Sequence, residues 1–127
     1  MEGLNELENA VLTKLLAGEH PILATLRLQV EAARLATREY SGNGFFCTFA
    51  VPPGPPPVAS NPTFRIGDVD AKVKGLKHGA GFVLFVKNGY LDMLEGYSYE
   101  EPWPAKLGEF ALHYQHEPRI VDSLLGK

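Results

Sequence analysis

Apolar residues in the N-terminal part of the chain recur with the spacing of two amphipathic helices. The first run ends before Gly18, and Pro21 can take the first position of a second helix. We therefore predict helices over about 3–17 and 21–38, joined as an αα-hairpin. Their apolar stripes are Leu4, Leu7, Val11, Leu12, Leu15 and Leu16 in the first, and Ile22, Leu23, Leu26, Val30, Ala33 and Leu35 in the second.

From Gly44 onward the apolar period changes to the two-residue alternation of strands. This alternation predicts strands over about 44–51, 67–74, 81–87, 90–99 and 109–114, with a short helix as the alternative for the last range. Residues 52–62 are rich in proline and are expected to form an exposed, stiff loop. Apolar residues after Pro118 indicate a final helical turn.

The pair Asn88-Gly89 predicts a two-residue turn, and this turn fixes the start of a hairpin register. If the two strands pair without interruption beyond this turn, the expected pairs are Lys87 with Tyr90, Val86 with Leu91, Leu84 with Met93, Phe82 with Glu95, Val83 with Leu94 and Phe85 with Asp92. Both faces of this hairpin are therefore largely apolar.

Together these elements predict one α+β domain over residues 1–127, with the N-terminal helical hairpin packed on a four- to five-stranded antiparallel sheet. Two helices cover one face of such a sheet, so the other face, with Val83, Phe85 and Leu94, needs another cover. We expect a homodimer subunit or a protein partner there. The alternative is that the proline-rich loop or the C-terminal tail folds over this face.

Composition narrows the possible partners and the compartment. The net charge of −3 and the lone basic cluster of Lys72, Lys74 and Lys77, with Asp68 and Asp70 beside it, argue against nucleic acid as a partner. The single Cys47 forbids an intramolecular disulfide, and no secretory or membrane-spanning segment is recognisable. We expect a cytoplasmic protein with no membrane partner.

The chain shows no complete catalytic set, cofactor motif or metal-ligand framework. Glu95 ends an apolar run, where it is either a strand end that meets water or a general acid or base in a cleft; the structural interpretation is favoured. The enzymatic alternative places a pocket between helices and sheet and pairs Glu95 with a histidine. Its candidates are His20, His78, His113 and His116.

Aromatic residues gather after the hairpin, where Trp103 lies between two prolines and follows Tyr97 and Tyr99. Trp103 either plugs the end of the sheet or joins the two tyrosines in an interaction surface. The segment Leu91-Asp92-Met93-Leu94-Glu95-Gly96-Tyr97, followed by Glu101-Pro102-Trp103-Pro104, resembles the signature of a family of small bacterial proteins, some of them similar in size and organisation to immunity proteins of toxin systems.

This resemblance, which covers chiefly residues 64–104, implies a cytoplasmic, non-enzymatic domain that binds a partner. It makes Asp92, Glu95, Tyr97, Tyr99 and Trp103 the first candidates for contact. Combined with the apolar second face, it predicts a protein-interaction domain rather than an enzyme. The full set of candidate interaction residues is Val83, Phe85, Asp92, Leu94, Glu95, Tyr97, Tyr99 and Trp103.

Overall fold

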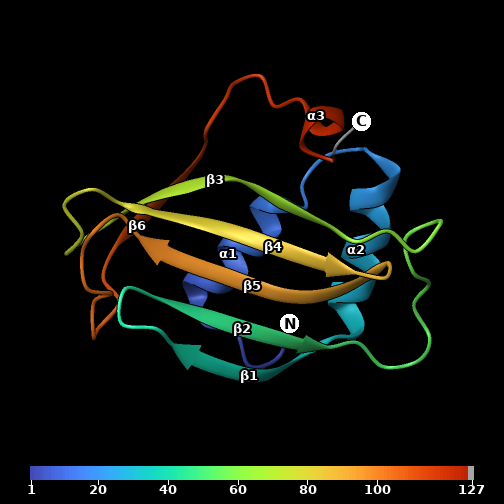
Figure 1. The fold of residues 1–127 in the computed structure, drawn as a ribbon, viewed down its shortest axis with the longest axis horizontal. Coiled ribbons are helices and arrows are strands. Elements are labelled where there is room, and N and C mark those ends of the chain that lie inside the picture. Colours follow the sequence, from blue (N-terminus) through green and yellow to red (C-terminus); the bar gives the residue numbers. More distant parts are fainter. Residues whose placement is uncertain (126–127) are drawn as a thin grey trace.

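Two N-terminal helices pack behind one antiparallel sheet in the computed structural model, which describes residues 1–125 (Figure 1). The fold is α+β, as predicted, although residues 126 and 127 of the expected domain lie outside the described part. Helix α1 (Glu6–Leu15) begins at a capping box, in which Asn5 and Glu8 each accept the other's backbone N–H. Helix α2 (Pro21–Ala32) starts with proline after the N-cap His20.

Within residues 1–125 the sheet has six strands, where the sequence predicts four or five. Their order across the sheet is β1-β2-β5-β4-β3-β6 and every neighbouring pair is antiparallel. The range 109–114, left open between strand and helix, forms the edge strand β6. The strands are β1 (Arg34–Tyr40), β2 (Gly44–Ala50), β3 (Phe64–Val73), β4 (Ala80–Lys87), β5 (Tyr90–Ser98) and β6 (Phe110–Tyr114).

Strand β1 corrects the prediction that the second helix continues to residue 38. Helix α2 ends at Ala32, because Ala33 is extended and residues 34–40 pair with β2 across a short turn at Ser41. The apolar residues of the sequence, taken alone, predict that the helix continues through Leu35. The inward side of β1 instead holds Arg38, which binds the buried carboxylate of Glu8.

The core lies between the helices and the inward face of the sheet. Helix α1 packs on β3 and β4, and α2 packs on β5. The inward strand residues are almost fully buried, among them Phe45, Cys47, Ile66, Val69, Phe82, Leu84 and Leu94. Every buried side-chain nitrogen and oxygen in the described chain has a hydrogen-bond partner. This face is a closed interior with its polar groups satisfied.

The proline-rich loop packs at the tip of the β4–β5 hairpin. Gln29 of α2 is completely buried and donates to the carbonyls of Pro56 and Gly89 at 3.0 and 2.9 Å, while it accepts the Leu91 N–H at 2.8 Å. Val58 in the middle of the loop is also buried. The loop is thus mostly exposed, as predicted, but it is fastened to the helix layer.

The C-terminal tail is held against the helix layer as well. Its helical turn α3 (Val121–Leu124), expected from the sequence, follows Arg119. Arg119 forms a two-point ion pair with Asp68, with nitrogen-to-oxygen distances of 2.7 and 3.1 Å. It also donates to the carbonyls of Leu15 and Ala17 at the end of α1. The tail is therefore anchored beside α1.

Neither of the longer helices, nor any other helix within residues 1–125, has the length and apolar character needed to cross a membrane.

Candidate interaction surface

No helix of the described residues 1–125 covers the face of the sheet opposite α1 and α2 (Figure 1). The strand register places Phe46 beside Glu95 and Val83 in one row, and Thr48 beside Met93 and Phe85 in the next. Phe46, Val83, Phe85 and Met93, which we call the open-face patch, are half-buried by one another and their strands. Apolar side chains from three neighbouring strands thus lie on this face, with Glu95 between Phe46 and Val83.

A β-bulge in β5 changes the predicted register. Lys87 faces Tyr90 and Val86 faces Leu91 as expected, but Phe85 faces Met93 because Asp92 is an extra, unpaired residue. Every later pair moves by one position, so that Val83 faces Glu95 and Leu84 faces Leu94. The predicted pairs beyond Leu91 are therefore wrong.

The bulge moves two candidate residues to the opposite sides from those predicted. Leu94 is 0% exposed and lies in the core, so it is not part of the open face. Glu95 lies on the open face between Phe46 and Val83, and not in a space under the helices. Val83 and Phe85 do lie on the open face, as expected.

The enzymatic alternative requires a histidine near Glu95 of β5, and His113 on β6 and His116 just after it are separated from β5 by β3 and β4 in the sheet. His20 lies in the helix layer, where its Nε2 is 2.9 Å from a carboxylate oxygen of Asp122. His78 and His113 line a hollow on the β3–β6 side of the sheet, and Glu95 is not among its lining residues. No three metal-ligating side chains come together within residues 1–125.

The aromatic candidates divide between the two sides of the sheet. Tyr97 and Tyr99 meet edge to face, with ring centroids 5.6 Å apart, over the backbone of Gly81. A Cβ at Gly81 would lie 2.6 Å from the ring of Tyr97, so glycine provides the room for this pair. Trp103 instead packs edge-on against Phe45, at 5.3 Å, beside the core. Its ring therefore contacts the core residue Phe45 and not the tyrosine pair.

Tyr99 connects the aromatic pair to β3, which carries Asp70. It is 37% exposed, and its hydroxyl donates to Asp70 at 3.2 Å. Partial burial, followed by the nearby Tyr97 and Asp70, raises the pKa of Tyr99 above its ordinary value. Tyr99 therefore stays a neutral hydrogen-bond donor across the physiological pH range.

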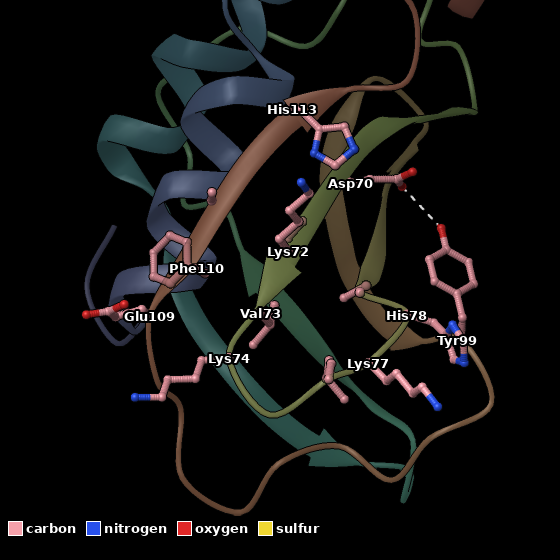
Figure 2. A pocket seen from close by; sticks show the side chains of 15 residues that line it. Asp70, Lys72, Val73, Lys74, Lys77, His78, Tyr99, Glu109, Phe110 and His113 are labelled. Atoms are coloured by element: carbon pink, nitrogen blue, oxygen red, sulfur yellow. Dashed lines mark hydrogen bonds between the residues drawn. The ribbon is translucent and has the colours of Figure 1, made fainter.

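Beyond Tyr99 lies a hollow of about 650 Å³, which we call the basic hollow (Figure 2). Alternation along β3 places Asp70 and Lys72 on the open face, and Lys74 continues this side after the strand ends. Lys77 and His78 come from the β3–β4 loop, and His113 on β6 pairs with Asp70. Sequence analysis identified the lysines but did not place the two histidines beside them.

The charge around these lysines differs from the sequence expectation. Asp68 is 4% exposed and bound to Arg119, so it does not neutralise the lysines of the hollow. Asp70 already accepts hydrogen bonds from Tyr99 and Gln115. The expected cancellation of the basic cluster is therefore wrong for Asp68, whereas Asp70 keeps its negative charge beside the lysines because both of its donors are neutral.

The loop beneath the basic hollow already binds one carboxylate. Both oxygens of Glu101 accept backbone N–H groups, from Lys77 and His78, each at 2.8 Å. These two hydrogen bonds, His78 first, lower the pKa of Glu101 below its usual value. Two backbone amides of the β3–β4 loop thus donate to a negatively charged group.

A search for similar proteins found no matching family model, curated protein or solved structure. The geometry of the open face is therefore the basis for assigning a function.

Proposed function

We propose that this chain is a non-enzymatic, cytoplasmic protein-interaction domain that binds a protein partner on the open face of its sheet. The observation that supports it most is the open-face patch, in which Phe46, Val83, Phe85 and Met93 lie on one face of three neighbouring strands with no helix of residues 1–125 over them. Contiguous apolar surface on a folded domain is characteristic of interaction sites. The partner-binding function implied by the 64–104 segment agrees with this proposal.

The positions of the loop and the tail add to the argument. Both were candidates to cover the open face from within the chain. Gln29 fastens the loop to the hairpin tip, and Arg119 anchors the tail to α1. An external protein surface is the remaining cover for Val83 and Phe85.

Site-specific photo-crosslinking in the native host tests this proposal. A photoreactive phenylalanine analogue at position 85 should give a discrete protein adduct, and mass spectrometry of the adduct separates a second copy from another protein. The same analogue at Leu28, which is 51% exposed on α2, is the control and should give no such adduct. Equal labelling at both positions would count against the open face as the binding site.

The variant Phe85→Glu tests the same contact by disrupting it. A charge at the centre of a buried apolar contact should abolish the crosslinked or native complex, while the exposed Thr13→Glu on α1 should leave it intact. Native mass spectrometry reports both outcomes. A folded Phe85→Glu protein that keeps its complex would refute the proposal.

A further inference from the structure

We infer that the basic hollow binds the carboxylate side chains of an acidic segment on the protein partner. This inference rests on the proposed function and adds the chemistry of the partner. The hollow adjoins the open-face patch, because Gly81 lies two positions from Val83 on β4 and pairs with both Tyr97 and Asp70. One partner surface can therefore reach both regions.

Unpaired positive charge is the first observation behind the inference. The hollow is lined by Lys72, Lys74 and Lys77 together with two histidines. None of the three lysines forms an ion pair with a carboxylate of residues 1–125. Their positive field is thus available to a ligand, although the chain as a whole carries a net charge of −3.

The nearby carboxylates Asp68, Asp70 and Glu101 have hydrogen-bond partners, and of these three only Asp68 is paired with a positive charge within residues 1–125. Asp68 is bound by Arg119, and Asp70 accepts from Tyr99 and Gln115. Glu101 is occupied by the backbone of the β3–β4 loop. The lining holds two acidic residues, Asp70 and Glu109, against three lysines. The balance in the hollow therefore favours a negatively charged ligand.

The shape of the hollow favours a peptide over a single small anion. A volume of about 650 Å³ has room for several side chains, and Gly79, Ala80 and Ala111 contribute little bulk to its walls. The lysines come from β3 and the β3–β4 loop and His113 from β6, so these side chains are spread around the hollow instead of converging on one point (Figure 2). Such spacing suits successive carboxylates on a chain.

An NMR titration of the full chain with capped hexaglutamate tests the inference. Backbone amide shifts should concentrate at Lys72, Lys77 and His78, saturate with a Kd of about 1 mM or tighter, and disappear in about 0.5 M salt. Capped hexalysine is the matched peptide control and should cause no such shifts. Inorganic phosphate is titrated separately to distinguish a peptide site from a small-anion site.

The charge-reversed pair Lys72→Glu and Lys77→Glu should weaken hexaglutamate binding by at least about tenfold. The control pair Arg34→Glu and Lys87→Glu makes the same change in net charge at exposed positions outside the lining, and should weaken it by less than about threefold. The fold of each variant is checked from its amide spectrum.

Three results would overturn the inference: no localised shifts with hexaglutamate, phosphate binding as tightly at the same amides, or equal losses in the two double variants. None of them bears on the photo-crosslinking at position 85. An adduct there without hexaglutamate binding would leave the protein-interaction function in place and remove only the acidic segment.

Discussion

The two faces of the sheet are built from the same strands but have different surroundings. On β4 the inward residues Phe82 and Leu84 are completely buried under the helices, while the outward residues Val83 and Phe85 remain half-buried. Both sets are apolar. A strand with one face toward water usually alternates apolar and polar residues. The apolar outward positions of β4 therefore have no explanation within the isolated fold.

This difference separates residues that stabilise the fold from residues available for binding. Substitutions on the closed face should lower the free energy of unfolding, and substitutions on the open face should chiefly change association. Substitutions on each face can therefore test this division by their effect on stability.

Replacing Arg119 with Met should lower the free energy of unfolding by about 3–5 kcal/mol, because the buried carboxylate of Asp68 would lose its only ionic partner in the described chain. Urea denaturation measures this loss. Arg34→Met, at an exposed position, serves as the control and should change stability by less than about 0.5 kcal/mol. Equal midpoints for both variants would show that the tail is not anchored as described.

A smaller loss is expected for Leu94→Ala, which removes a fully buried side chain and should cost about 2–5 kcal/mol. Its neighbour Met93 faces the opposite side, and Met93→Ala should cost less than about 1 kcal/mol. Comparing these adjacent residues by urea denaturation tests the position of the bulge. The uninterrupted register would place Met93 opposite Leu84, in the core, and reverse the order of the two losses.

Much of the fold follows from local sequence signals. The first helix, the start of the second and the β4–β5 turn all depend on nearby residues, and Asn88 and Gly89 do adopt the positive φ angles that the turn requires. The predicted second helix is too long because apolar residues continue past its true end at Ala32, with Ala33 three residues after Val30. The signal for β1 was the Ser41–Gly44 turn beside it, which also predicts a hairpin.

The candidate site was less predictable because its contacts join distant parts of the chain. The turn fixes the pairing of Val86 with Leu91, but nothing local shows that Asp92 is an extra residue, and one extra residue exchanges the faces of Leu94 and Glu95. Similarly, the lysines were visible in sequence, whereas the partner of Asp68 lies 51 residues away at Arg119. The charge balance at the basic hollow could therefore be worked out only from the folded structure.

A more gradual effect concerns Cys47, which lies on the closed face next to the open-face residue Thr48. Burial, and then the nearby Glu8, raises the pKa of Cys47 to about 12. Because the neutral thiol is favoured in the folded state, its contribution to stability is complete below the unfolded pKa of about 9 and is lost as the pH rises toward 12.

Wild-type protein should therefore lose about 1 kcal/mol of stability per pH unit between about 9 and 12 relative to Cys47→Ser, in which this titration is absent. Urea denaturation across that range measures the difference. A thiol moved to the open face, in the double variant Cys47→Ser and Thr48→Cys, should react with a thiol reagent at least about a hundredfold faster than Cys47 in the folded protein. Similar reaction rates would mean that the helix layer opens readily, and the contrast between a closed and an open face would then lose its physical basis.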